Sequence, residues 1–435
     1  MSAEAFAAPV VTAAAPRKRV FVGAWLLSGA TVAAGVLTYA FLVLAARTLG
    51  PHAYGHVAAL WGAIFIGAVV LFRPLEQTAS RTISDRLARG YEVRTVLRSL
   101  VLLGAVMVVC TGILGAIAWG TITDRLFLGN AALTALLLAG TIAYGISYIV
   151  RGVVGGVSWF GGYGLVLVAD GAARLAVAAP LVIVASERLA GAAMVCAALA
   201  GALVPLAFGR SRVRRALVLR AGPPFRARAA WAFAAPATVI AAADQLLVNG
   251  APLMVILDGG SRATRSAGVV FAATMLVRAP VYVFQGLAAS FLPNLTGLAA
   301  GGDRRGFREA VARSSLALLG VGIAIVVGVA TAGPAAMHAL YGGGFTAGRL
   351  DLSLLAAGAG LYLVAGTASQ GLLAVARTGT AAAIWAAGAV SFMGLFAVLP
   401  GSELRRASLA FALAVAAVAV ALTAGILRAT KHRTA

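Results

Sequence analysis

The residues of this sequence that could do chemistry are charged side chains that stand inside long apolar stretches. A charge at the centre of a bilayer costs roughly 2.5 kcal/mol or more, so each such residue is a functional candidate by default. Three pairs of opposite charge meet this description. They are Asp170 with Arg174, Asp244 with Arg278, and Arg73 with Glu76.

The first two pairs lie deep in their apolar stretches. Asp170 and Arg174 are four residues apart, so they share one helical face and can pair. Either they form a self-neutralising structural pair, or Arg174 offers a cation to a substrate phosphate. Asp244 and Arg278 stand about halfway along two consecutive stretches that would run antiparallel, at similar depth. They predict a bridge between helices, which is either a gate or a structural tie.

The third pair and three amides complete the set of polar candidates. Arg73 and Glu76 fall where an apolar stretch reaches the basic side of the membrane, as a snorkelling structural pair or as part of a gate. Gln245, Asn249 and Gln285 add hydrogen-bonding capacity to the helices of Asp244 and Arg278. Together these residues suit a polar cavity wall.

The elements that position these residues are membrane-spanning helices. The chain of 435 residues is 61% hydrophobic and 11% charged, with a mean hydropathy of +0.97, whereas soluble domains carry about 25% charged residues. Its apolar runs of twenty or more residues exclude an alternating β-barrel and predict an all-α polytopic membrane protein. The twelve expected spans are 21–46, 53–73, 98–119, 129–150, 163–186, 189–209, 231–256, 267–292, 314–336, 350–374, 379–399 and 407–427.

The distribution of basic residues predicts the orientation of the chain. With the N-terminus inside, the cytoplasmic segments hold 24 Arg and Lys residues and the outer loops hold 8. The positive-inside rule therefore predicts an N-in, C-in topology. The net charge of +22 lies mainly in short loops, so anionic membrane lipids are the expected counter-charge and nucleic acid is not. The strong preference for Arg over Lys indicates a high-GC bacterial genome and hence the bacterial cytoplasmic membrane.

The most basic connection divides the chain into two six-helix lobes around a central cavity. It contains Gly222-Pro223-Pro224 between the sixth and seventh spans, and a weak echo supports the division, since GHVAA from Gly55 and GVVFAA from Gly268 open the second and eighth spans. The expected organisation is a cytoplasmic tail (1–20), a first lobe (21–209), a basic linker (210–230), a second lobe (231–427) and a second tail (428–435).

Sequence motifs for enzymatic chemistry are absent. No DxD, nucleotide-binding P-loop or HExxH occurs, and the four histidines are dispersed. Cys110 and Cys196 fall in separate spans, which makes a disulfide framework unexpected. The outer loops are too short to fold as domains. We therefore expect no enzyme, metal site or cofactor, and transport or scaffolding remains.

Three short motifs resemble the polysaccharide-transporter branch of the multidrug/oligosaccharidyl-lipid/polysaccharide (MOP) flippase superfamily. Residues 44–55 (LAARTLGPHAYG) resemble the family's opening motif, 149–156 (IVRGVVGG) resemble its RG-x-x-x-G segment, and 278–285 (RAPVYVFQ) with Leu292-Pro293 resemble its R-x-P…Q…LP pattern. The resemblance implies twelve to fourteen helices in two lobes around a V-shaped cavity, with alternating access. It also implies export of polyprenyl-diphosphate-linked sugars.

The motifs place Arg47 in the first loop, Arg151 at the entrance to the fifth span, and Arg278 with Gln285 in the eighth. Some family members use two extra C-terminal helices to hold a lipid tail. The twelve spans expected here do not include them, which leaves the path of the tail open.

A flippase for a diphosphate-linked glycan needs a wet, cationic cavity, because the polar head cannot cross hydrocarbon unaided. Arginine suits this task, since its guanidinium stays charged and binds phosphate in a bidentate fork. The predicted substrate-binding residues are Arg278, Arg174, Gln285, Asn249 and Gln245. The predicted gating or coupling residues are Asp244, Asp170, Arg73 and Glu76.

The remaining expectations concern coupling, partners and alternatives. Energy would come from the membrane potential or from a coupling ion, Na⁺ or H⁺. A polysaccharide polymerase or glycosyltransferases are expected partners. Two alternatives stay open: a cation-coupled multidrug exporter of the same superfamily, which would use Asp170 and Asp244, and a non-transporting scaffold that recruits glycan enzymes.

Overall fold

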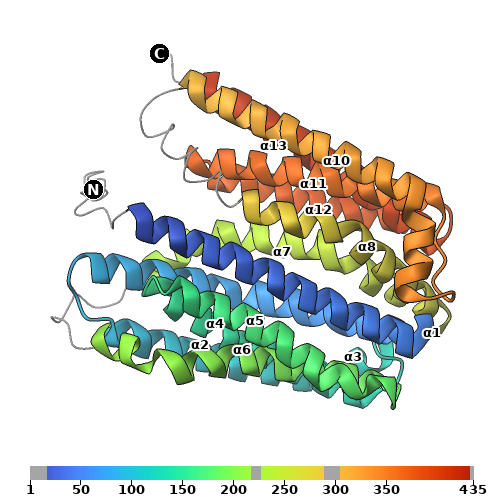
Figure 1. Ribbon diagram of the computed structural model, residues 1–435, viewed down its shortest axis with the longest axis horizontal. Helices are drawn as coiled ribbons and strands as arrows, with labels where there is room; N and C mark the ends of the chain where they lie inside the picture. Colours follow the sequence, from blue (N-terminus) through green and yellow to red (C-terminus); the bar gives the residue numbers. More distant parts are fainter. Residues whose placement is uncertain (1–16, 217–226, 289–303, 432–435) are drawn as a thin grey trace.

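The structure is a computed structural model that describes residues 17–216, 227–288 and 304–431, almost all of them helical (Figure 1). The first half contains α1 (Arg17–Ala88), α2 (Arg94–Ile117), α3 (Trp119–Arg125), α4 (Ala131–Gly156), α5 (Phe160–Ala178), the 3-10 helix η2 (Ala179–Val182) and α6 (Glu187–Ala216). The second half contains α7 (Ala227–Gly259), the 3-10 helix η3 (Gly260–Ala263), α8 (Thr264–Ala288), α10 (Arg304–Tyr341), α11 (Arg349–Ala374), α12 (Thr378–Val398) and α13 (Glu403–Lys431).

The helix α1 is two membrane crossings joined by a sharp break. Gly50 leaves the helical conformation with a φ of 69°, a region that glycine adopts without a steric penalty. Pro51 follows, and because it has no backbone N–H it is suited to begin the next helical segment. The break falls between the spans predicted at 21–46 and 53–73.

A similar turn separates α7 from α8. Gly260 has a φ of 58° and opens the short helix η3. Within the described residues, ten segments are long and apolar enough to cross a membrane, and two of them, Leu26–Ala88 and Ala235–Val281, are long enough to cross twice. The prediction of a polytopic all-α membrane protein with about twelve crossings is therefore confirmed.

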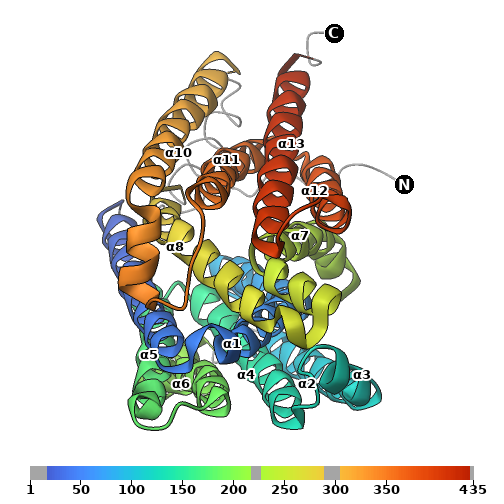
Figure 2. The same ribbon diagram turned by 90° about the vertical axis from the view of Figure 1, so that its right-hand side faces the viewer.

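The helices form two groups that meet along α1. Figure 2 shows α1 to α6 on one side and α7 to α13 on the other. The helix α1 packs against α4 and α5 of its own group and against α7 and α8 of the other. Helices extend into the predicted basic linker, since α6 runs to Ala216 and α7 begins at Ala227, and residues 217–226 lie outside the described chain.

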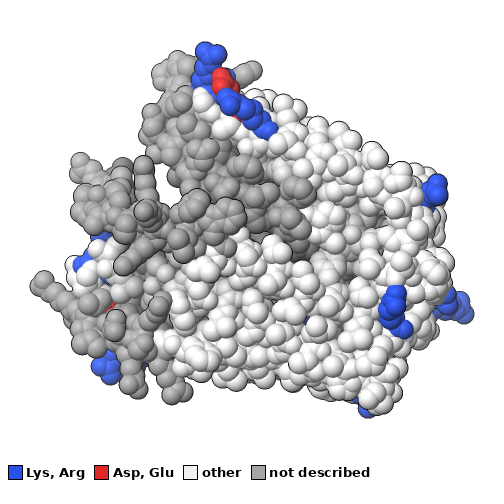
Figure 3. All heavy atoms as spheres, in the orientation of Figure 1, with Lys and Arg blue, Asp and Glu red and all other residues white. Residues whose placement is uncertain are grey.

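The surface agrees with a chain that spans a bilayer. On the face shown in Figure 3, charged side chains gather at the two ends and leave an uncharged belt between them. The helices α2 and α10 turn most of their apolar surface outward, with only 17% and 22% of their most apolar segments buried. The beginning of α1 and the end of α13 lie at one end (Figure 1), which the positive-inside rule assigns to the cytoplasm. We call it the cytoplasmic end and its opposite the outer end.

Candidate functional site

At the outer end the two helix groups meet through a reciprocal contact between glycines. A Cβ atom on Gly55 would lie 2.0 Å from the carbonyl oxygen of Thr264, and one on Gly268 would lie 2.1 Å from that of Pro51. Thr264 precedes Gly268 by four residues, and Pro51 precedes Gly55 by four. The sequence echo between the second and eighth spans is therefore a pair of equivalent surfaces packed on each other, at a distance that only glycine permits.

Side chains complete this contact. The guanidinium of Arg47 donates from Nε to the carbonyl oxygen of Leu340 at 2.8 Å, at the end of α10. Tyr54 packs between Phe271 and Phe345, with ring centroids 5.6 Å from each. We call the contacts made by Gly55, Gly268, Arg47 and Tyr54 the outer closure. It joins α1 to α8 and to the end of α10.

Close contact between the groups continues from the outer closure toward the middle of the helices. A Cβ atom on Gly62 would lie 2.6 Å from the carbonyl oxygen of Asn249 in α7. The hydroxyl of Tyr39 donates to the carbonyl oxygen of Met275 in α8 at 2.9 Å. The described contacts between the groups thus gather in the outer half of the molecule.

Asp244 accepts hydrogen bonds from two side chains that the sequence did not pair with it. Its carboxylate accepts one hydrogen bond from the hydroxyl of Tyr362 in α11 and a second, of 3.1 Å, from Gln245. Gln245 in turn accepts one of 2.8 Å from Asn249. The bridge from Asp244 to Arg278 that the sequence suggested stays a prediction. The two oxygens of Asp244 are turned along α7 and toward α11.

Arg278 lies on the face of α8 that turns toward α1. It follows Phe271 by seven residues and Met275 by three, and both of these contact α1, so the three share one side of the helix. Arg278 is buried, one turn nearer the cytoplasmic end than the contact between Tyr39 and Met275. Gln285 belongs to α8, but its side chain lies outside the described part of the structure.

Arg73 faces Asp244 across the two groups. The guanidinium of Arg73 lies within Coulombic range of Asp244 in α7 and of Glu76 one turn along α1. Glu76 accepts a hydrogen bond of 2.8 Å from the hydroxyl of Tyr163 in α5. Three of the predicted gating residues, Arg73, Glu76 and Asp244, therefore lie near one another.

Arg151 joins this group from the end of α4. Its guanidinium lies over the ring of Tyr148, 5.2 Å from the centroid, and within Coulombic range of Glu76 and Tyr163. Its Nε atom is buried and has no hydrogen-bond partner among the described residues. We call the resulting cluster the polar layer. Its members are Arg73, Glu76, Tyr148, Arg151, Tyr163 and Asp244.

Sequence reasoning assigned no role to the tyrosines, and it reached Arg151 only through the motif. One local signal accompanies that arginine. A Cβ atom on Gly152 would lie 2.8 Å from the carbonyl oxygen of Glu76, so the Arg-Gly pair brings α4 directly against α1. The glycine after Arg151 thus indicates that this arginine lies where α4 and α1 approach closely.

Asp170 and Arg174 form a hydrogen-bonded network inside the first group. They are ion-paired, and the hydroxyl of Tyr144 accepts from Arg174 at 2.6 Å and donates to Asp170 at 3.1 Å. Arg174 also donates to Thr38 at 3.0 Å and lies 5.2 Å from the ring centroid of Trp61. The side chain of Arg174 is 2% exposed. This placement favours the structural interpretation of the pair over contact with a substrate.

A second polar network ties the first group together at the outer end. His56 and Glu187 are joined by a hydrogen bond of 2.6 Å, and Asn130 donates to the other oxygen of Glu187 at 2.7 Å. The ring of His52 lies 5.7 Å from that of His56. Within the described ranges, no cluster of three or more His, Cys, Asp or Glu residues could hold a metal ion.

Two curated relatives cover about three quarters of the chain. An uncharacterized protein of Mycobacterium tuberculosis is 28% identical over 346 residues, which are 77% of this chain and 75% of that protein. An uncharacterized protein of Mycobacterium bovis is 26% identical over 351 residues, or 76% and 75%. No family model matches the sequence.

Solved structures give the fold a name. An inward-facing multidrug resistance MATE family transporter of the MOP superfamily superposes with a TM-score of 0.73 at 15% identity, over 92% of this chain and 96% of that one. An outward-facing one gives 0.65 at 14%, over 95% and 99%. A MOP superfamily transporter from Pyrococcus furiosus gives 0.63 at 15%, over 94% and 97%.

The chain therefore has the fold of the MOP superfamily transporters, the class to which these three solved structures belong.

Proposed function

We propose that this protein is a MOP superfamily transporter of the bacterial cytoplasmic membrane that moves polyprenyl-diphosphate-linked oligosaccharide by alternating access. The fold supports a membrane transporter, since its structural neighbours are transporters over nearly their whole length. A site between two lobes, sealed at one end at a time, is the common plan of such proteins. In the arrangement described here the seal is the outer closure.

The polar layer is the observation that carries the choice of substrate. Arg73 and Arg151 lie within the bilayer-spanning helices, and Arg278 lies on the face of α8 that turns to α1. The acidic groups near Arg73 are Asp244 and Glu76, and those near Arg151 are Glu76 and Asp170, which is paired with Arg174. Cationic side chains at this depth are costly unless an anion compensates them. A diphosphate supplies that charge and fits the bidentate guanidinium fork.

The two deep carboxylates offer less to a cationic drug than the sequence suggested. Asp170 is neutralised by Arg174, and Asp244 is hydrogen-bonded by Tyr362 and Gln245. In this proposal Arg73, Arg151 and Arg278 hold the diphosphate, and Gln245 and Asn249 line the way toward the sugar. The pair of Asp170 and Arg174 stabilises the first lobe. A coupling ion, Na⁺ or H⁺, and glycan-assembling partner enzymes remain predictions.

The test measures leaflet exposure of a fluorescent polyprenyl-diphosphate oligosaccharide in proteoliposomes. The wild type is expected to expose the probe, and Arg151→Gln is expected to slow exposure about tenfold to a hundredfold, since a hydrogen bond to a charged group contributes about 1.5–3 kcal/mol. Arg89→Gln is the matched control, because this arginine is exposed and its ion pair is with Asp85, four residues earlier in the same helix.

Two results would contradict the proposal. Wild-type protein that leaves several probes unexposed but extrudes a cationic dye along a proton or sodium gradient is a drug exporter. Protein that transports neither, while recruiting glycan enzymes through its basic loops, is a scaffold.

A further inference from the structure

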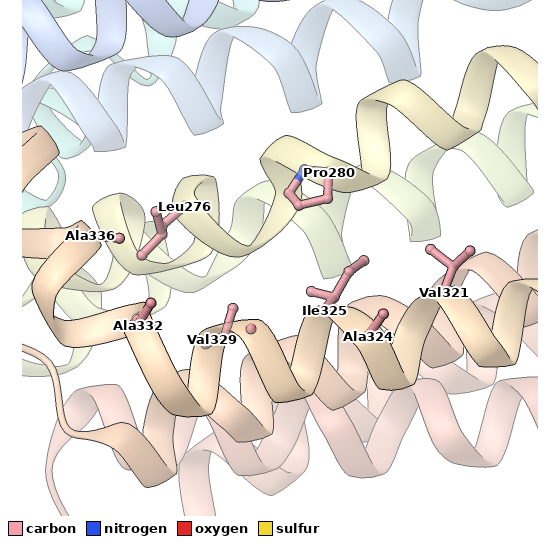
Figure 4. A pocket seen from close by; sticks show the side chains of 10 residues that line it. Leu276, Pro280, Val321, Ala324, Ile325, Val329, Ala332 and Ala336 are labelled. Carbon is pink, nitrogen blue, oxygen red and sulfur yellow. The ribbon is translucent and has the colours of Figure 1, made fainter.

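A cavity of about 420 Å³ lies between α8 and α10, away from the polar layer (Figure 4). Leu276 and Pro280 line it from α8, and eight residues of α10 between Val321 and Ala336 line it from the other side. Every one of these lining side chains is apolar. We call this cavity the α8–α10 groove. Its volume is that of an ordinary small-molecule site, but it lacks the few polar groups by which such sites orient a soluble ligand.

The wall formed by α10 has two parallel rows of different shape. One row consists of branched side chains four residues apart, among them Val321, Ile325 and Val329. Beside it runs a row of small residues that includes Ala324 and Gly328. Residues four apart on a helix are separated by about 6 Å along its axis. The wall is therefore notched at regular intervals, a shape that a chain with methyl branches fills better than a straight one.

The location of the groove restricts its occupant to hydrocarbon. Its lining residues fall within the candidate spans Ala235–Val281 and Arg305–Tyr341. Water would find no hydrogen-bonding partners there. On the adjoining face of α10, Ile323 and Val327 are more than half exposed, so the groove borders the surface that faces the bilayer. A chain already in the membrane can enter sideways, without passing through water.

Arg278 stands in the same turn of α8 as Leu276 and Pro280, on the opposite face. A lipid whose diphosphate lies at Arg278 therefore reaches the groove if its chain passes around one helix, a width of about 10–12 Å. A long polyprenyl chain covers this span easily. The helix α8 would then separate the polar head of the substrate from its tail.

We propose that the α8–α10 groove holds the isoprenoid chain of the carrier lipid during transport, an inference that rests on the proposed function. The groove would hold the lipid tail in a chain whose twelve expected spans do not include the two extra C-terminal helices that some family members use for this purpose. Because lipid tails are as apolar as the groove, the groove contributes packing and alignment of the substrate rather than hydrophobic transfer.

The binding test uses photo-crosslinking on the wild-type protein in liposomes. One probe is a polyprenyl phosphate with a diazirine in its chain, and the other is a phosphatidylglycerol with a diazirine in an acyl chain. The polyprenyl probe is expected to label the peptide that contains Gly328, and excess unlabelled polyprenyl phosphate is expected to reduce that labelling at least tenfold. Equal labelling by the phosphatidylglycerol probe, insensitive to this competitor, would mean an ordinary acyl-chain site and would overturn the inference.

The functional test fills the groove. Gly328→Phe is expected to slow exposure of a long-chain polyprenyl-diphosphate glycan at least tenfold and to leave binding of a short-chain analogue with the same head unchanged. Val327→Phe, on the exposed face of the same turn, is the matched control and is expected to behave as wild type. Ala324→Leu provides a milder filling variant, and thermal unfolding in detergent verifies the fold of all three.

The outcomes separate the two proposals. If the wild type moves the glycan and the filling variants move it equally well, the groove inference fails while the proposed function stands. If the wild type moves no glycan, the proposed function fails, and the crosslinking result alone decides whether the groove binds isoprenoid.

Discussion

The outer closure and the polar layer lie between the same two groups of helices and are built in opposite ways. At the outer closure, backbone meets backbone, with glycines at 55 and 268 pressed against carbonyl groups. In the polar layer, long side chains such as Arg73 and Arg151 meet tyrosines and carboxylates. Among the described residues each surface keeps one buried polar atom without a hydrogen-bond partner, the hydroxyl of Tyr54 in the outer closure and the Nε of Arg151 in the polar layer, but only the second belongs to a charged group.

This difference indicates how a transporter can open at one end and bind its substrate at the other. The surfaces that meet at Gly55 and Gly268 consist of backbone and carry no buried charge. Separating them therefore exposes no charge that was buried. A closure made by packing can therefore open at a modest cost. Buried guanidinium groups, in contrast, remain costly until an anion compensates them. The polar layer is thus suited to respond to a ligand.

The largest effect is expected from breaking the outer closure. Gly55→Leu puts a side chain where a Cβ atom already lies 2.0 Å from the oxygen of Thr264, so the closed state cannot form. In a background without Cys110 and Cys196, a cysteine at the buried position Ala267 is expected to react with an impermeant maleimide from outside roughly 100-fold faster, as an open state of about 1% becomes dominant.

Gly35→Leu is the control for this experiment, because a Cβ atom on Gly35 meets nothing within 4 Å. Gly268→Leu is expected to reproduce the effect of Gly55→Leu, since the contact is reciprocal. Equal labelling in the Gly55 and Gly35 variants would mean that the glycine contact does not hold the outer end closed.

An intermediate effect is expected when the attraction between Arg73 and Asp244 is removed from the polar layer. A double-mutant cycle of Arg73→Gln and Asp244→Asn is expected to show a coupling of about 1–2 kcal/mol in thermal or denaturant unfolding, because both side chains are partly buried and attract each other. The exposed pair of Arg89 and Asp85 is the reference, for which about 0.3–0.5 kcal/mol is expected. A coupling energy no larger than that of the reference pair would mean that the attraction between Arg73 and Asp244 does not hold the two groups of helices together.

The smallest effect is expected at the rim of the outer closure. Arg47→Gln removes the hydrogen bond to Leu340 and a cation near the carbonyl end of α10. The contact is exposed, so the expected loss is about 0.5–1.5 kcal/mol of closed-state stability, or roughly a twofold to tenfold rise in labelling at position 267. A rise as large as that of Gly55→Leu would show that side chains, rather than backbone contact, hold the closure.

The fold could be read from the sequence because its determinants are local. Runs of twenty apolar residues predict crossings wherever they occur, and glycine followed by proline at 50–51 predicts a break whatever surrounds it. The pair of Asp170 and Arg174 was found for the same reason, since residues four apart on a helix are neighbours before any packing takes place.

Partners on different helices could not be read in this way. Depth along the helices suggested Arg278 for Asp244 but gave no sign of Tyr362 in α11 or of Arg73 in α1, because such partners depend on how each helix is rotated about its axis. Tyr148 and Tyr163 gave no signal, because aromatic residues are common in apolar spans. That Arg174 is enclosed by Tyr144 and Trp61 likewise depends on the positions of α1 and α4.

The sequence by itself determined that this chain crosses a membrane about twelve times, where it turns, and which charges must lie inside. Only the tertiary structure decided which of those charges are neutralised within one group of helices and which lie between the two groups. The physical reason is that hydropathy and helical periodicity act within a segment, whereas the pairing of buried charges depends on the rotation and separation of whole helices.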